Sequence, residues 1–196
     1  MPIVYLLRHG ESESNREECY QGSGESPLTK QGQREARAAS RRLKHIPFAA
    51  AFSSDLSRAY ETACAIAKPH RISVKKAKGL RERSYGHWEG KRFDEIEQRW
   101  PALYRRWLIH PAQAHIPGAE TLRELQTRAV KTFRQLIQSF GKKDPLLMVA
   151  HGGWNRALLF HFLGLKLDHF WHIRQTNCGL NIIEVRSCPV IRMING

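Results

Sequence analysis

The sequence lacks the features that mark membrane, secreted and zinc-binding proteins. None of the apolar runs among its 196 residues approaches the ~20 residues that a membrane-spanning helix needs. Its N-terminus has no basic segment followed by an apolar signal core. Its four cysteines form no C-x-x-C pair, so we expect neither a zinc site nor a disulfide framework. These absences predict a cytoplasmic protein with reduced thiols and no membrane association.

Acidic residues are scarce in this chain. It has 18 Asp and Glu residues against 32 Lys and Arg residues, which gives a net charge of +14. Such a charge attracts anions, and both nucleic acid and phosphorylated metabolites are candidates. A basic stripe at helical spacing, which a solvated helix face explains, consists of Arg34, Arg37, Arg41 and Lys44. No glycine-rich or aromatic-interleaved RNA-binding pattern accompanies it, which favours a small phosphorylated metabolite over nucleic acid.

Strand-like and helix-like segments alternate along a chain that suits a single domain, expected to cover residues 1–196. Strands are expected at about 2–7, 48–52, 72–75, 146–150, 180–185 and 190–194, and helices at about 29–44, 53–68, 120–140 and 154–163. This order predicts an α/β fold, a three-layer α/β/α sandwich with a mostly parallel central sheet and an antiparallel edge made by the last two strands. The segment at about 76–119 is expected to fold over a crevice as a lid or side wall. Four tryptophans are expected to serve packing: Trp88, Trp100, Trp107 and Trp171.

Two apolar runs in this chain end in the same dipeptide, His-Gly. The first, residues 3–7, leads into Arg8 and His9, and the second, residues 146–150, leads into His151. Strands that are apolar on both faces are usual in a parallel sheet covered by helices. Ligands bind such sheets at the carboxyl ends of the strands. We therefore expect the two histidines, far apart in the sequence, to meet over one crevice.

The residues at these strand ends suit a phosphate group. Arginine grips two phosphate oxygens, and a neutral histidine can attack phosphorus, so Arg8 and His9 form a plausible pair. Arg58 is expected in the first turn of a helix that follows a strand, beside the positive end of the helix dipole. A proton donor for the leaving oxygen is also needed, and Glu82 is the best candidate. Periodicity does not place Glu82 in the crevice, and a surface ion pair is its alternative reading.

Arg8-His9-Gly10-Glu11-Ser12 resembles the signature of the histidine phosphatase superfamily, also called the phosphoglycerate mutase-like family. Further motifs resemble those of the family, in order and over nearly the whole chain: Asn15, Gln21-Gly22, Ser26-Pro27-Leu28-Thr29 with Gly32, Ser53-Ser54-Asp55-Leu56-Ser57-Arg58-Ala59 with Thr62-Ala63, Leu80-Arg81-Glu82 with Gly86 and Trp88-Glu89-Gly90, Pro117-Gly118-Ala119-Glu120-Thr121, His151-Gly152-Gly153 and Asn177-Cys178-Gly179. Each motif is weak alone, whereas the ordered series is specific. The resemblance implies a phosphoglycerate mutase-like fold.

The resemblance also implies a role for each matching residue. His9 would be the nucleophile that becomes a phosphohistidine, and Glu82 would be the general acid and then the base. The phosphoryl group would be held by Arg8, Arg58 and His151. Asn15, Gln21 and Gly22 would line the pocket, with a further N–H donated by Gly152. No metal and no other cofactor is implied, because the arginines supply the positive charge.

Three functions remain open at this point. The chain is too short for the lid insertion that shields the phosphohistidine of larger phosphoglycerate mutases, which favours a metal-independent phosphatase acting on a small phosphomonoester. A cofactor-dependent mutase is the first alternative, because Arg83 and Tyr85 resemble residues that bind substrate carboxylate in mutases, and they also resemble a fructose-bisphosphatase-like branch. Residues 170–174 resemble the short bacterial phosphatases, including α-ribazole phosphatases. An inactive scaffold or nucleic-acid-binding protein is the second alternative, against which the complete set of site residues argues.

Overall fold

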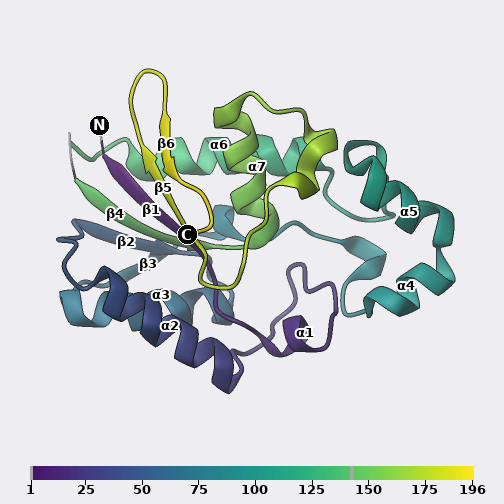
Figure 1. Cartoon of the computed structure of the whole chain (residues 1–196), viewed down its shortest axis with the longest axis horizontal. Helices are drawn as coiled ribbons and strands as arrows, with labels where there is room; N and C mark the ends of the chain where they lie inside the picture. Colours follow the sequence, from purple (N-terminus) through teal and green to yellow (C-terminus); the bar gives the residue numbers. More distant parts are fainter. Residues whose placement is uncertain (1, 142–143) are drawn as a thin grey trace.

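The computed structural model describes residues 2–141 and 144–196 and contains a six-stranded sheet in the order β3-β2-β4-β1-β5-β6 (Figure 1). The strands are β1 (Ile3–Arg8), β2 (Ala50–Ser53), β3 (Val74–Lys76), β4 (Pro145–Ala150), β5 (Leu180–Glu184) and β6 (Val190–Met193). The α-helices are α1 (Glu13–Arg16), α2 (Lys30–Leu43), α3 (Ser57–Ala67), α4 (Phe93–Arg99), α5 (Pro101–Ile109), α6 (Leu122–Ile137) and α7 (Gly152–Leu163). Short 3-10 helices lie at Lys68–His70, Lys78–Leu80, Gly86–Trp88, Pro111–Gln113 and Leu167–His172.

Helices cover both faces of the sheet, as the sequence predicts. Figure 1 shows α2 and α3 on one face and α6 and α7 on the other. Successive residues of β4 face opposite sides, because side chains alternate along a strand. Leu146 and Met148 join the core formed with α6 and α7, whereas Leu147 and Val149 join the core formed with α2 and α3. Burial on both faces explains why this strand is a continuous apolar run rather than an alternating one.

The register of the central strands sets up one edge of the sheet. β1 and β4 are parallel neighbours whose last residues, Arg8 and Ala150, are partners in the ladder. The residues that follow, His9 and His151, therefore leave the sheet side by side. β2 and β3 extend the parallel part, while β5 pairs antiparallel with β1 and β6 pairs antiparallel with β5. The expected antiparallel edge is confirmed.

Several helix boundaries differ from the sequence-based expectation. The side chain of Thr29 caps α2, as predicted, by accepting from the Gly32 N–H. Helix α3 begins only at Ser57, because the carboxylate of Glu25 accepts both the N–H and the hydroxyl of Ser57 at the helix start. Helix α7 begins at Gly152 rather than at residue 154, so the glycines after the strand form its first turn.

Residues 76–119 contain α4, α5 and three short 3-10 helices packed over one end of the sheet. Trp88 and Trp107 in this segment are fully buried, in agreement with their expected packing role. The indole N–H of Trp107 donates to the hydroxyl of Tyr20 across 2.8 Å. Among the described residues, no helix combines the length and the apolarity needed to cross a membrane.

Candidate active site

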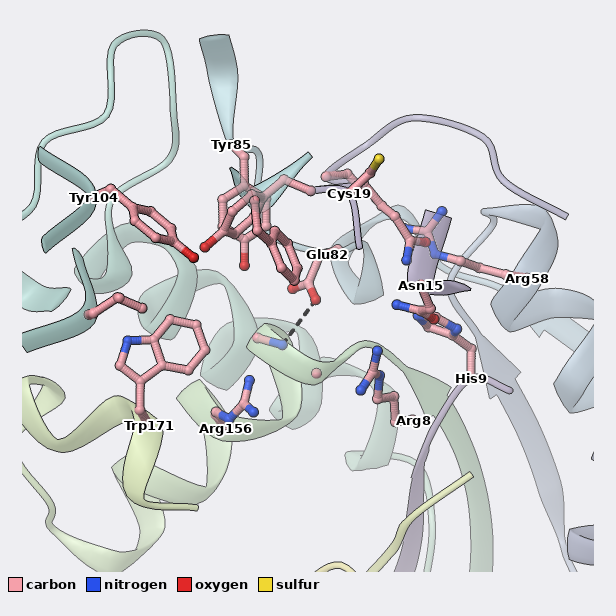
Figure 2. A pocket seen from close by; sticks show the side chains of 17 residues that line it. Arg8, His9, Asn15, Cys19, Arg58, Glu82, Tyr85, Tyr104, Arg156 and Trp171 are labelled. Carbon is pink, nitrogen blue, oxygen red and sulfur yellow. Dashed lines mark hydrogen bonds between the residues drawn. The ribbon is translucent and has the colours of Figure 1, made fainter. Parts of the chain in front are cut away.

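A cavity of about 280 Å³ lies at the carboxyl ends of β1 and β4. The cavity walls come from widely separated segments: Arg8, His9, Asn15, Cys19, Tyr20, Gln21, Gly22, Arg58, Glu82, Tyr85, Phe93, Tyr104, Leu108, Gly152, Gly153, Arg156 and Trp171. Figure 2 shows Arg8, His9 and Arg58 at one end and Tyr85, Tyr104 and Trp171 at the other. The cavity therefore has a cationic end and an aromatic end.

His9 lies at the cationic end, and one of its ring nitrogens is hydrogen-bonded to the backbone. Its Nδ1 is 2.7 Å from the carbonyl oxygen of Gly10, which can only accept, so Nδ1 carries the proton. The Gly10 N–H in turn donates to the hydroxyl of Thr62, which fixes the backbone next to the histidine. In the neutral ring this arrangement leaves a lone pair on Nε2.

The surroundings of His9 oppose its protonation. Burial lowers the pKa of His9 well below the ordinary 6.5, and the charges of Arg58 and Arg8 lower it further, outweighing the hydrogen bond to Gly10. The imidazole is therefore neutral at neutral pH, with Nε2 available as a nucleophile.

His151 lies directly beside His9 and is completely buried. The two ring centroids are 5.0 Å apart, with the planes inclined by 61°. Burial, followed by the charge of Arg58, lowers the pKa of His151 well below its ordinary value. Neither ring nitrogen of His151 has a hydrogen-bond partner within the described residues, which is unusual for a buried polar group and indicates a site for an incoming acceptor. His151 does not itself line the cavity and lies behind its surface beside His9.

Two arginines complete the cationic end. Arg58 donates to the carbonyl oxygens of Gly24 and Gly22 at 2.8 and 2.9 Å, and Arg8 donates to that of Gln175 at 2.7 Å. Both Nε atoms are buried and, within residues 2–141 and 144–196, have no acceptor. Burial is the main cause that lowers the pKa of Arg58 to about 10, so this guanidinium keeps its charge at neutral pH. An anion entering the cavity meets oriented donors with unused capacity.

Glu82 reaches the cavity through contacts that its local sequence does not reveal. Its Oε2 accepts the N–H of Gly153 at 3.0 Å, and its Oε1 accepts those of Trp154 and Arg83 at 3.2 and 2.8 Å. Two of these donors belong to the exposed N–H groups in the first turn of α7. Figure 2 shows the carboxyl group held against this turn, at the boundary between the two ends of the cavity.

The pocket residues expected from the resemblance also lie at this cavity. The Oδ1 of Asn15 accepts from Ser12 and Asn177, which turns its amide N–H₂ toward the cavity. Gln21 likewise uses its Oε1 to accept from Ser12 at 2.9 Å. Gly22 has a φ of +53°, a conformation that glycine adopts without strain. Gly152 is the first residue of α7, where an N–H has no acceptor within the helix.

Arg83 and Tyr85 lie together in the structure, with the guanidinium carbon of Arg83 5.1 Å from the ring centroid of Tyr85, but only Tyr85 reaches the cavity. Tyr85 lines the cavity, and burial raises its pKa above the ordinary 10. Arg83 is only 1% exposed and does not line the cavity. Its guanidinium carbon lies 4.5 Å from the ring centroid of Trp107, and its Nε donates to the carbonyl oxygen of Glu120. The structure thus does not bring Arg83 to the substrate position that the sequence suggested, because this side chain packs behind the cavity wall.

Several cavity residues were not expected from the sequence, and Arg156 and Trp171 are two of them. Arg156 follows the second His-Gly motif by one helical turn, and this spacing from a strand end is the signal that could have found it. Trp171 was expected to serve packing alone, but it also lines the cavity, and its indole N–H donates to the carbonyl oxygen of Trp107 at 2.9 Å.

Comparisons with known proteins agree on one family. The family model described as "Histidine phosphatase superfamily (branch 1)" matches residues 4–193. "Phosphoserine phosphatase 1" of Hydrogenobacter thermophilus is 29% identical over 187 residues, which are 95% of this chain and 88% of the relative. "Probable phosphoglycerate mutase GpmB" of Salmonella choleraesuis is 32% identical over 188 residues, which are 94% and 85% of the two chains. The solved structure "Bacillus stearothermophilus YhfR" is similar with a TM-score of 0.94 and 30% identity, covering 98% of this chain and 96% of that one.

Proposed function

Because the chain belongs to the histidine phosphatase superfamily, we propose that it is a phosphatase that hydrolyses a small phosphomonoester through a phosphohistidine on His9. One observation carries this proposal. His9 is buried and neutral, its Nδ1 proton is bound to Gly10, and its Nε2 is free at the cationic end of the cavity. A nucleophilic nitrogen beside two arginines is the arrangement that phosphoryl transfer requires.

The reaction proceeds in two steps. In the first, Nε2 of His9 forms a bond to phosphorus while the bond from phosphorus to the ester oxygen breaks, and the carboxyl of Glu82 gives its proton to that oxygen. In the second, water attacks the phosphohistidine while the carboxylate of Glu82 takes its proton, which releases inorganic phosphate and restores both residues. Arg8, Arg58 and His151 stabilise the charge on the transferring oxygens.

The positive charge for this reaction comes from side chains. Magnesium-dependent phosphoryl transfer uses carboxylates to hold the ion. In the part of the chain that the structure describes, no group of three His, Cys, Asp or Glu side chains is gathered as metal ligands. Arg8 and Arg58 line the cavity beside His9 and can neutralise phosphate charge there, which supports metal-independent hydrolysis.

A cofactor-dependent mutase is the second candidate, and the similarity to the relative named a probable phosphoglycerate mutase favours it. A mutase and a phosphatase share the phosphohistidine and differ in its acceptor, a second hydroxyl or water. Incubation with 3-phosphoglycerate separates the two. A phosphatase releases inorganic phosphate and glycerate, whereas a mutase forms 2-phosphoglycerate without net release of phosphate.

Trapping the covalent intermediate tests the proposal directly. The chain is mixed with phosphomonoesters carrying labelled phosphorus, quenched, and assayed for protein-bound label that is lost in acid and retained in alkali, as phosphohistidine is. We expect label on the wild type and none on His9→Ala, with turnover of the variant reduced below measurement. A His9→Ala variant that keeps a tenth of the wild-type turnover contradicts the assignment of the nucleophile.

Binding of random DNA by a protein without phosphatase activity would instead favour the nucleic-acid-binding alternative. The affinity for DNA should then fall steeply as the salt concentration rises.

A further inference from the structure

Arg156 is a half-buried arginine that lines the cavity and forms no ion pair with a carboxylate of the described residues. It lies on α7 and lines the cavity between the two ends described above. Its Nε donates to the carbonyl oxygen of Ile173 at 2.7 Å. Across residues 2–141 and 144–196, the ion pairs include none made by Arg156. The proposed chemistry, which needs Arg8 and Arg58, leaves this third guanidinium without a task.

The position of Arg156 is adjacent to the phosphate end but separate from the nucleophile. A Cβ built on Gly152 would lie 3.5 Å from Nε of Arg8 and 3.7 Å from Nη1 of Arg156, so the two guanidinium groups flank the same residue. Burial and then the charge of Arg156 lower the pKa of Arg8. Burial and then the charges of Arg58 and Arg8 lower the pKa of His9. Figure 2 shows Arg156 between Arg8 and Trp171, toward the aromatic end of the cavity. In an ester whose phosphoryl group lies beside His9, the part that contacts Arg156 would therefore be the leaving group.

The guanidinium of Arg156 is held in place before any ligand arrives. Its carbon lies 5.0 Å from the ring centroid of Trp171 and 5.6 Å from that of Phe170. Together with the Nε bond to Ile173, these contacts fix the plane of the group and leave its terminal nitrogens for a ligand. An ordered, partly desolvated guanidinium binds an anion at a smaller entropic cost than a mobile surface arginine does.

We propose that Arg156 binds a carboxylate on the leaving group, so that the substrate is a small phosphorylated hydroxy acid or amino acid. The planar fork of arginine matches the two oxygens of a carboxylate. Because Arg156 and Arg8 flank the same residue, a carboxylate on Arg156 would lie close to the phosphoryl group, and the cavity of about 280 Å³ suits a compact molecule. This inference rests on the phosphatase activity proposed above and adds to it the class of substrate.

A matched pair of esters tests this recognition. 3-Phosphoglycerate and glycerol 3-phosphate differ only in that a carboxylate of the first is a hydroxymethyl group in the second. We expect the wild type to have the higher kcat/KM for 3-phosphoglycerate. Arg156→Met should lower that value about 10- to 100-fold, the size of one lost charge-assisted interaction, and change the value for glycerol 3-phosphate by less than about threefold. Arg156→Lys keeps the charge but loses the planar fork of the guanidinium. Its kcat/KM for 3-phosphoglycerate should lie between those of the wild type and Arg156→Met.

A control variant removes the same charge away from the cavity. Arg105 on α5 is exposed and does not line the cavity, so Arg105→Met should leave the preference between the two esters unchanged. Because both esters are assayed on one preparation, a smaller fraction of folded protein lowers both rates and leaves their ratio intact. Equal losses on the two esters in Arg156→Met would overturn the inference and assign Arg156 to the phosphoryl group or to the fold.

Two further outcomes separate this inference from the proposed function. A wild type that hydrolyses both esters with no preference for 3-phosphoglycerate would overturn the inference and leave the phosphatase intact. Calorimetric titration of His9→Ala measures binding of both ligands without turnover, and we expect tighter binding of 3-phosphoglycerate that is lost in His9→Ala combined with Arg156→Met. The same binding preference in a wild type that hydrolyses neither ester would overturn the phosphatase and uphold the carboxylate site.

Discussion

The carboxylate of Glu82 and the backbone of Gly153 are joined by a hydrogen bond of 3.0 Å from the Gly153 N–H to Oε2. The close approach requires glycine, because a Cβ at position 153 would lie 2.5 Å from Oε1 of Glu82. Helix α7 thus begins with His151 as its N-cap and holds Glu82 two residues later. One helix start therefore positions the proposed phosphate ligand, His151, and the proposed proton donor, Glu82, relative to each other.

Replacement of Glu82 should affect poor leaving groups most. An alkoxide needs a proton in the transition state, whereas a nitrophenolate barely does, so Glu82→Gln should slow glycerol phosphate hydrolysis by about 10²- to 10⁴-fold. The loss on nitrophenyl phosphate should be far smaller when formation of the phosphohistidine limits the rate. Single-turnover assays of both esters measure the two losses. Equal losses would show that Glu82 orders the site rather than donating the proton, and the exposed Glu97→Gln serves as the control for the charge change.

Arg128 should act on the reaction through Glu82. Its guanidinium pairs with the carboxylate of Glu120 at 2.7 Å and donates to the carbonyl oxygens of Gly79, Arg81 and Glu82. Arg128→Met removes all of these contacts, although the carbonyl oxygen of Gly79 still accepts from the indole N–H of Trp154. We expect a loss of about 2–4 kcal/mol in the free energy of unfolding. Urea denaturation measures this loss.

The activity of Arg128→Met should follow the pattern of Glu82→Gln at lower amplitude. A loss that is larger for glycerol phosphate than for nitrophenyl phosphate marks a displaced proton donor, whereas a merely unstable protein loses both rates alike. Arg134→Met, which removes an exposed arginine from the same helix, is the control and should change neither stability nor the ratio of rates appreciably. If the ratio of the rates on the two esters is unchanged in Arg128→Met, Arg128 does not position Glu82 for the reaction.

The parts of the site that could be predicted from the sequence are those fixed by strands. His9 and His151 each follow an apolar run, and parallel strands end at a common edge, so their meeting needed only the strand assignments. The position of Glu82 depends instead on N–H groups more than 70 residues later in the chain. No local pattern encodes such a contact, and the resemblance to the family was needed to select Glu82.

The same difference between strand-fixed positions and long-range contacts explains which arginine positions could be predicted from the sequence. Arg58 was placed by its helix start, and it lies where a helix after β2 must aim its first turn. Arg83 is adjacent to Glu82 in sequence but packs against Trp107 behind the cavity, while Arg156 occupies the cavity. The choice between them depends on how residues 76–119 pack, which involves aromatic contacts between distant segments rather than periodicity.

Chelators should leave the activity unchanged. In the proposed mechanism, arginines rather than a bound ion supply the positive charge. We therefore expect EDTA to have no effect on hydrolysis and vanadate, which mimics the transferring phosphoryl group, to inhibit it. Steady-state rates before and after exhaustive EDTA treatment provide the measurement. A loss that a divalent cation restores contradicts this account of the site, and inhibition by vanadate that persists in EDTA supports it.

The protonation of His9 should respond to the charge of Arg58. Burial and the neighbouring arginines hold the pKa of His9 well below 6.5, so the neutral imidazole persists into acidic solution and is lost only as the pH falls through the lowered pKa. Arg58→Gln removes one of those charges, and the pKa of His9 should rise toward its ordinary value. At a pH below 6.5, a larger fraction of His9 in the variant is therefore protonated and unable to attack phosphorus.

NMR titration of histidine Cε1–H signals, assigned with the His9→Ala variant, measures this shift without requiring turnover. His151 lies 5.0 Å from His9, and protonation of one ring opposes protonation of the other, so the two signals are fitted as a coupled pair. Arg58→Gln should move the pair upward in pH, whereas Arg105→Gln, which changes an exposed charge outside the cavity, should not. A wild-type His9 that titrates at or above 6.5 would contradict the structure's account, because protonation near neutral pH would then remove the lone pair of Nε2 on which the proposed reaction depends.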